Sequence, residues 1–184
     1  MPSDNFRKLS ERPVYDSALL HVAVAIFEAP DGSHFERDIV HHPGAVVMVP
    51  FDEGTGEVVL VRQYRAPLDT EVLEVPAGKR DVHGEPPEVT AQRELAEEAG
   101  LEAGKLELIG RFFNSPGFSD EQSLCYLARD LRAVPDERHG VEEQHMTVER
   151  VKFSEVGALV RAGEITDAKT IVGLFLTQAF LSLP

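Results

Sequence analysis

Three glutamates stand close together in the middle of the 184-residue chain: Glu94, Glu97 and Glu98. The segment around them is predicted to be helical, because Pro86-Pro87 suit a first helical turn and Gly100 suits the end of a helix. At about 100° per residue, the three carboxylates fall within one arc of about 100°. Like charges spaced three or four residues apart on a helix repel each other, and a hard divalent cation would relieve that repulsion. The spacing therefore predicts a site for a cation that prefers oxygen ligands.

The other side of this helix carries the residues that would pack on the rest of the protein. They are Val89, Leu95, Ala96 and Ala99, with Gln92 as a polar exception. An acidic face turned to solvent would show the same periodicity, so the helical pattern alone leaves both interpretations open. The order of residue types around the glutamates distinguishes a cation site from a solvent-exposed acidic face.

That order follows a longer pattern that begins at Gly78. Six residues separate Gly78 from Glu85, and seven residues separate Glu85 from Arg93. From Arg93 the chain reads Arg93-Glu94-Leu95-x-Glu97-Glu98-x-Gly100-Leu101. This resembles the Nudix box of the Nudix hydrolases, G-x5-E-x7-R-E-U-x-E-E-x-G-U, in which U is aliphatic. The one departure is the first gap, which has six residues instead of five and lengthens the loop before the helix.

The resemblance implies a role for each box residue. The implied ligands of Mg²⁺, for which Mn²⁺ can substitute, are Glu94, Glu98, Glu97 and the Ala77 carbonyl. Glu85 and Arg93 are expected to pair and hold the loop against the helix, and Gly78 is expected to form a tight turn that supports the site. Two or more divalent ions would neutralise and orient a diphosphate, which is the chemistry of a hydrolase.

The general base is expected outside the box. Glu142 and Glu143 lie in a polar stretch, 132–146, that is predicted to be a mobile loop able to swing over the metal ions. Relatives that hydrolyse ADP-ribose carry a catalytic glutamate in a loop at this place. The resemblance favours Glu143 over Glu142, with Glu97 as a further catalytic candidate.

Two further stretches indicate the substrate class. Pro116 lies sixteen residues after Gly100 in the sequence Ser-Pro-Gly-Phe-Ser-Asp-Glu, which ends at Glu121. This stretch and the Gln-Tyr-Arg that ends at Arg65 are similar to the ADP-ribose pyrophosphatase subfamily. By this resemblance Arg65 would bind a phosphate through its forked donors, Glu121 would lie near the terminal ribose or the metal site, and Arg37 is a weaker phosphate candidate.

Three functions are compatible with these residues. The first is Mg²⁺-dependent hydrolysis of ADP-ribose to AMP and ribose 5-phosphate. The second keeps the reaction but changes the nucleoside diphosphate sugar, for example to GDP-mannose or ADP-glucose. The third is a non-catalytic sensor that binds ADP-ribose, but such proteins usually have an eroded box and an attached DNA-binding domain. Here the box carboxylates are intact and no basic domain is evident.

The amino-acid composition limits the kinds of partner that this protein is expected to bind. The net charge of −14 argues against a nucleic-acid backbone or an anionic membrane, because both attract cationic surfaces. The seven histidines, among them His41, His42 and His83, lack zinc-binding spacing. A single cysteine, Cys125, excludes an internal disulfide. With no signal-peptide pattern and no apolar run near ~18 residues, a cytoplasmic protein with a small-molecule substrate is expected.

The expected fold class is α/β (α+β), with one domain over 1–184. Strand-like runs are 19–28, 35–41, 45–50, 57–64, 71–76, 105–114, 122–129 and 147–153, and helices are expected at 154–163, capped by Ser154, and at 167–181, capped by Asp167. The first fourteen residues are expected to be loosely ordered or edge structure. The resemblance implies a Nudix-type mixed β-sheet sandwiched between helices. It also implies an N-terminal antiparallel sheet extension, 1–42, that contributes to a homodimer.

Overall fold

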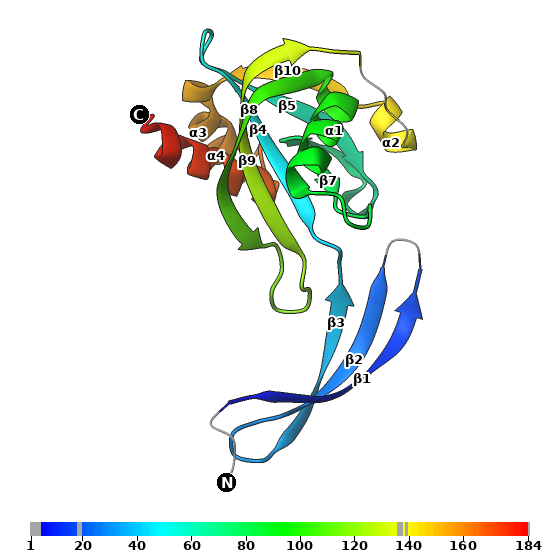
Figure 1. Ribbon diagram of the computed structural model, residues 1–184. Helices are drawn as coiled ribbons and strands as arrows, with labels where there is room; N and C mark the ends of the chain where they lie inside the picture. The colour runs from blue at the N-terminus through cyan, green and yellow to red at the C-terminus, as the bar shows by residue number, and fades with distance from the viewer. Residues whose placement is uncertain (1–4, 18–19, 136–137, 139, 184) are drawn as a thin grey trace. The chain divides into compact units, whose positions relative to one another are not determined.

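The computed structural model of the protein describes residues 5–17, 20–135, 138 and 140–183 (Figure 1). The chain forms two compact units. The smaller unit comprises 1–44 together with 113–122, and the larger comprises 45–112 and 123–184. The sequence predicted one domain with an extension over 1–42. The structure adds the segment 113–122, which includes Pro116 and Glu121, to the N-terminal unit.

The smaller unit is built on an antiparallel sheet of three strands in the order β1-β2-β3. The strands are β1 (Arg7–Asp16), β2 (His21–Glu28) and β3 (His34–His41). β1 is an edge strand with two register shifts, a place where a residue such as Pro13 is tolerated because one side of the strand needs no donor. The strand predicted from Leu19 begins at His21, and Leu19 itself lies outside the described residues.

The larger unit is a mixed sheet covered by helices. Its strands are β4 (Ala45–Asp52), β5 (Glu57–Arg65), β6 (Thr70–Glu74), β7 (Ala77–Lys79), β8 (Leu101–Phe113), β9 (Gln122–Ala133) and β10 (Thr147–Lys152). The order is β10-β5-β4-β9-β8, with β6 on β5 and β7 on β4. β4 and β9 run parallel, whereas β4 and β5 run antiparallel. The elements between and after them are η1 (Ala66–Leu68), α1 (Pro87–Ala99), α2 (Val141–Gln144), α3 (Phe153–Ala162) and α4 (Ala168–Leu181).

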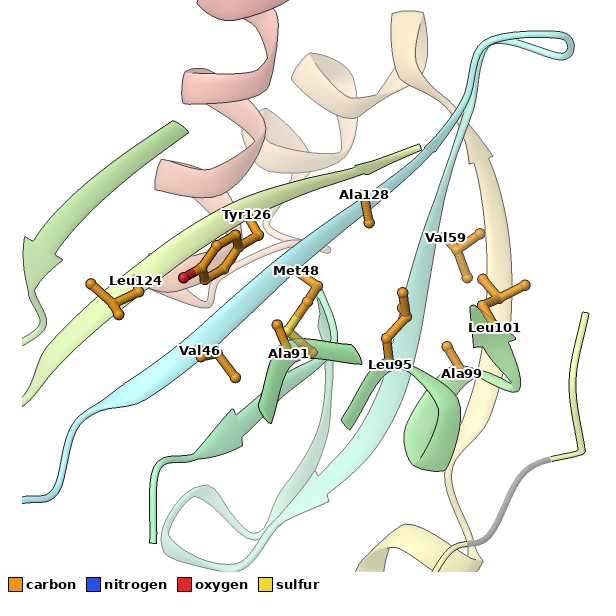
Figure 2. Packing of buried hydrophobic residues seen from close by; sticks show 10 residues of the cluster. All are labelled: Val46, Met48, Val59, Ala91, Leu95, Ala99, Leu101, Leu124, Tyr126 and Ala128. Atoms are coloured by element: carbon orange, nitrogen blue, oxygen red, sulfur yellow. The ribbon is translucent and has the colours of Figure 1, made fainter. Parts of the chain in front are cut away.

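β4 has a helix layer on each side of it, as its nearly continuous burial requires. Val46 and Met48 pack with Leu95 of α1 (Figure 2). Val47 and Val49, whose side chains alternate to the other face, pack with Leu174 of α4 and its neighbours in α3. The mixed sheet sandwiched between helices, predicted from the sequence, is confirmed. Leu95 is fully buried, and replacing such a leucine by alanine typically costs about 2–5 kcal/mol.

Local details differ from the sequence-based expectations. α3 begins at Phe153, after Lys152, with no side-chain cap, so Ser154 is not its N-cap. Asp167 does cap α4, because its carboxylate accepts a hydrogen bond from Thr170 N at 2.8 Å. In the stretch expected to be a loop, β9 continues to Ala133 and a one-turn helix, α2, follows at 141–144. None of the helices in the described residues is both long enough and apolar enough for a membrane span.

Candidate functional site

α1 packs inward with a different face from the one that its hydrophobic periodicity predicted. Val89 was expected to pack inward but is 51% exposed, while Glu98 is buried at 6% exposure. The residues of α1 classed as buried are Thr90, Ala91, Leu95, Glu98 and Ala99. Gln92, the expected polar exception, donates to the Ala103 carbonyl at 3.2 Å. One box glutamate therefore lies on the inward face of the helix.

Glu98 is held there by the backbone of β7. Ala77 N donates a hydrogen bond to Glu98 Oε2 at 2.9 Å. Ala77 was expected to contribute its carbonyl to a metal site. The structure shows its N–H fixing the Glu98 carboxylate, which places the segment before Gly78 directly against the helix.

Gly78 lies where the side chain of Glu94 crosses the backbone. A Cβ atom at Gly78 would overlap Cγ, Cδ and Oε1 of Glu94. Gly78 belongs to β7 and has no left-handed backbone conformation, so close approach rather than a tight turn explains the glycine. The first residue of the box therefore makes room for one of its carboxylates.

Arg93 connects the carboxylates of the box. Its Nη1 contacts Glu94 Oε1 at 2.8 Å and Glu97 Oε2 at 3.1 Å, and its Nη2 contacts Glu85 Oε2 at 3.4 Å. Glu85 also accepts a hydrogen bond from Thr90 Oγ1 at 2.7 Å. Burial opposes the charge of Arg93, but the neighbouring carboxylates raise its pKa. The pairing of Glu85 with Arg93 that was expected to anchor the loop is present.

The loop between Gly78 and Glu85, which is one residue longer than in the box pattern, ends in a turn. Glu85 N donates to the Val82 carbonyl at 3.2 Å, and Gly84 adopts the left-handed conformation with φ of 79°. Such a conformation favours glycine, which has no Cβ to clash. The turn ends at Glu85, whose carboxylate forms the ion pair with Arg93.

The box cluster, defined here as Glu94, Glu97 and Glu98, has more negative charge than its surroundings balance. Burial, opposed by the Ala77 N–H and reinforced by Glu94 and Glu143, raises the pKa of Glu98 to about 8. Burial also raises the pKa of Glu94, although Arg93 opposes the shift. Carboxylates with raised pKa values are poised to gain from a nearby positive charge.

The box cluster fits a hard cation in donor type and in charge. Each of its carboxylates uses one oxygen in a hydrogen bond or ion pair, and the other oxygen has no such partner in the described part of the chain. Oxygen donors of this kind suit Mg²⁺ or Mn²⁺. Among the described residues, no group of three or more His, Cys, Asp or Glu side chains is arranged so that it could hold a metal ion. The side chains of the box cluster would therefore have to move closer together to bind one.

The two candidate bases in the 141–144 helix have different neighbours. The charge of Glu143 contributes to the raised pKa of both Glu94 and Glu98, whereas the charge of Glu142 acts on Tyr64. Glu143 Oε2 also accepts a hydrogen bond from Gly140 N at 3.0 Å. Glu143 is thus the candidate whose field reaches the box cluster, and its carboxylate is held at the start of its own helix.

A second set of charges in the same unit was not anticipated from the sequence. We call it the Glu74 network: Arg65, Glu74, Asp167 and Lys169. Arg65 binds Glu74 through Nε at 2.6 Å and through Nη2 at 2.7 Å, and Lys169 Nζ contacts Glu74 at 3.1 Å and Asp167 at 2.7 Å. A signal was available, since Glu74 interrupts the apolar run 72–75, where a buried carboxylate needs a counter-charge. Its partner Lys169 lies 95 residues away and could not be named.

The other substrate-binding candidates belong to the smaller unit. Arg37 extends over the Phe35 ring, with Cζ 4.6 Å from its centre. Pro116 is exposed, and the Glu121 backbone N–H is bonded to Ser119 Oγ at 3.2 Å. The loop that carries Pro116 and Glu121 is joined to β3 by a hydrogen bond from Val40 N to the Phe118 carbonyl at 2.8 Å.

A histidine clamp reinforces that junction. His41 Nδ1 lies 2.6 Å from Asp120 Oδ2, and His41 Nε2 lies 2.7 Å from Glu11 Oε1. The hydrogen bonds to Asp120 and Glu11 raise the pKa of His41, although burial opposes the shift. An imidazole between two carboxylates donates to both only when it is protonated.

Comparison with known proteins identifies the family. The family model described as the NUDIX domain matches residues 40–172. The chain belongs to the NUDIX family. This Nudix hydrolase is 38% identical to the "ADP-ribose pyrophosphatase" of Bacillus subtilis (strain 168), over 97% of this chain and 95% of the relative. It is 36% identical to the "ADP-ribose pyrophosphatase" of Mycobacterium tuberculosis (strain ATCC 25618 / H37Rv), over 97% of this chain and 86% of that protein.

A solved structure has the same fold. The "Crystal structure of ADP compounds hydrolase" superposes with a TM-score of 0.84, at 22% identity, and covers 96% of this chain and 94% of that one. The Nudix fold expected from the box is thereby confirmed over nearly the whole chain.

Proposed function

We propose that this Nudix hydrolase cleaves the diphosphate of ADP-ribose with Mg²⁺, releasing AMP and ribose 5-phosphate. The observation that carries the proposal is the combination of near full-length similarity to two ADP-ribose pyrophosphatases with a complete set of box carboxylates. A sensor that only binds ADP-ribose has no need of the charge deficit in the box cluster.

Different residues of the larger unit would bind the cation, position its ligands and bind the substrate phosphate. A divalent cation, when bound, supplies positive charge that neutralises and orients the diphosphate. The cation would be held by Glu98 and Glu94, with Glu97 beside them. The Glu98 carboxylate is fixed by Ala77 N, and the Glu94 side chain lies against Gly78. Arg93 keeps Glu94 and Glu97 in place. Arg65 would bind a substrate phosphate with the donors that Glu74 leaves unused.

Glu143 is proposed as the general base. Its charge reaches Glu94 and Glu98, which supports its place near the reacting phosphate. To accept a proton from the attacking water, its carboxylate must exchange the Gly140 N–H for that water. The short helix that carries Glu143 would act as the mobile part of the site.

The test of substrate is a product assay with purified protein and Mg²⁺ against ADP-ribose, ADP-glucose and GDP-mannose. We expect AMP and ribose 5-phosphate from ADP-ribose, with the highest kcat/KM of the three. Brisk cleavage of another sugar nucleotide without AMP from ADP-ribose would overturn the proposed substrate while leaving the reaction class intact.

The test of the base uses two neighbouring variants. Glu143→Gln should lower kcat by about 100-fold or more, in the range typical of lost general-base catalysis, without weakening cation binding. Glu142→Gln is the matched control and should retain activity. Equal activity of Glu143→Gln and wild type would remove Glu143 from this role.

A homodimer formed through the β1-β2-β3 sheet is part of the proposal. Apolar side chains on or beside this sheet are exposed, with Phe6 at 67% and Tyr15 at 58%. A three-stranded sheet cannot cover both of its own faces, so a second copy would bury these groups. Sedimentation of Phe6→Ser and Tyr15→Ser variants should show a shift toward monomer. A cytoplasmic location is also proposed, since Cys125, the only cysteine, is a buried thiol.

A further inference from the structure

The Glu74 network surrounds a carboxylate that is almost completely removed from solvent. Glu74 is 2% exposed and receives Arg65 on one edge through two short bonds, at 2.6 and 2.7 Å. Lys169 adds a third contact, to Oε2, at 3.1 Å. Two cationic partners compensate the desolvation cost of a buried carboxylate, and removing one of them removes part of that compensation.

Lys169 is itself fixed by the first turn of α4. Its Nζ contacts Asp167 Oδ1 at 2.7 Å, and Asp167 Oδ2 accepts hydrogen bonds from the backbone N and the hydroxyl of Thr170 at 2.8 and 2.7 Å. The Thr170 hydroxyl in turn accepts a hydrogen bond from Val75 N at 2.9 Å. The start of α4 is therefore joined to the strand end that carries Glu74, three residues before Ala77.

The guanidinium of Arg65 is presented in one orientation by this arrangement. It has five N–H donors, of which two point at Glu74. The other three have no acceptor among the residues described, and the side chain is 38% exposed. One edge of the planar group is thus fixed inward and the opposite edge is free for a phosphate.

We propose that Lys169 is a positioning residue for substrate, acting through Glu74 on Arg65. With Lys169 in place, Glu74 Oε2 is held by two cations and the carboxylate plane is set. Without it, the carboxylate keeps only its two bonds to Arg65, and the bonded pair can turn together about the last side-chain bond of Glu74, which has broad rotational freedom. Arg65 then loses its fixed direction. This inference rests on the phosphate-binding role proposed above for Arg65.

The expected kinetic signature is a change in KM rather than in kcat. A phosphate contact made in both the substrate complex and the transition state contributes uniform binding, so its loss raises KM. Lys169→Met should raise the KM for ADP-ribose about tenfold, with kcat changed less than about twofold. Lys169→Arg, which restores a cation, should recover most of the loss. A purely structural role would lower the folded fraction and hence kcat, with KM unchanged.

The deciding experiment is a double-mutant cycle between Lys169→Met and Arg65→Ala, with KM and kcat measured for all four proteins. If Lys169 acts through Arg65, Lys169→Met has no further effect on KM once Arg65 is absent. The matched control is Lys152→Met, which removes a lysine that pairs with Glu57 at 2.9 Å on an exposed strand and should leave KM as in wild type.

Three results would overturn the inference: an unchanged KM in Lys169→Met, an equal KM increase in both backgrounds, or an unchanged KM in Arg65→Ala. Failure of the proposed substrate is visible separately, because wild type would then release no AMP from ADP-ribose. In that case the cycle is run with the sugar nucleotide that wild type does cleave, and the same criteria apply.

Discussion

The box cluster and the Glu74 network are both sets of carboxylates in the larger unit that include one buried glutamate, but they differ in how their charge is balanced. In the Glu74 network, burial would raise the pKa of Asp167, yet the charge of Lys169 and hydrogen bonds from Lys169 and Thr170 lower it. In the box cluster, burial prevails and raises the pKa of Glu98 to about 8. Burial alone therefore does not set the direction of a carboxylate pKa shift, because the positive charge around the carboxylate also decides it.

The largest expected effect is on the box cluster. Glu98→Gln should lower kcat/KM on the order of 1,000-fold, because it removes a charge from the cation ligands proposed above. Its raised pKa means that Glu98 stabilises the fold only while protonated, and this stability is lost as pH rises from about 4.5 toward 8. The variant should therefore unfold at a higher temperature than wild type at pH 8, without added metal.

Turnover at saturating Mg²⁺ and thermal unfolding are the two measurements for Glu98→Gln. Glu155→Gln, in the exposed first turn of α3, is the matched control and should change neither. Near-wild-type activity of Glu98→Gln would show that the helix does not carry the cation site.

The same substitution in the Glu74 network should have the opposite effect on stability. Glu74→Gln leaves Arg65 and Lys169 without their shared anion, and losing such charged hydrogen bonds costs about 2 kcal/mol. Urea unfolding should therefore show a lower midpoint with an unchanged slope. Glu57→Gln, which removes a partly exposed ion pair with Lys152, should leave the midpoint where it is. A Glu74→Gln protein as stable as wild type would mean that the network is not balanced by charge.

Added Mg²⁺ should distinguish the two clusters directly. At ten times its dissociation constant, a ligand that binds only the folded state adds about 1.4 kcal/mol of stability. We expect this increase in wild type and in Glu74→Gln but not in Glu98→Gln, as measured by thermal unfolding over a Mg²⁺ titration. Equal stabilisation of all three proteins would place the cation away from the box cluster.

The smallest expected effect concerns the histidine clamp, because the positive charge of His41 is lost when its imidazole is deprotonated. The pKa of His41 is raised in the folded protein, so the stability it contributes is complete below about 6.5 and is lost as pH rises through the folded pKa. The protection factors against hydrogen exchange of Val40 N and Asp120 N, which join β3 to the loop, should fall modestly above that range. In His41→Gln, these protection factors should not change with pH. A pH-dependent protection factor that persists in His41→Gln would assign the effect to another group.

Much of the site could be predicted because its information is local in the sequence. Pro86-Pro87 and Gly100 indicate the limits of α1, and the residues around Asp167 indicate that it is a cap. The rotation of α1 was not predictable, since periodicity assigns Glu98 to the acidic face and only packing on β7 shows that it is buried. Lys169 was missed for a related reason: its partner Glu74 is distant in sequence, and a lysine near a helix start normally reads as solvent-exposed.

The turn at Val82–Glu85 also makes this region a useful place for protein engineering. Both of its ends are fixed, at Gly78 by the strand and at Glu85 by Arg93, while Val82 between them is 51% exposed. A loop with anchored ends tolerates added length with little entropic cost. A fluorophore or a short epitope placed here would report on events at the neighbouring carboxylates without shifting the register of the helix that bears them.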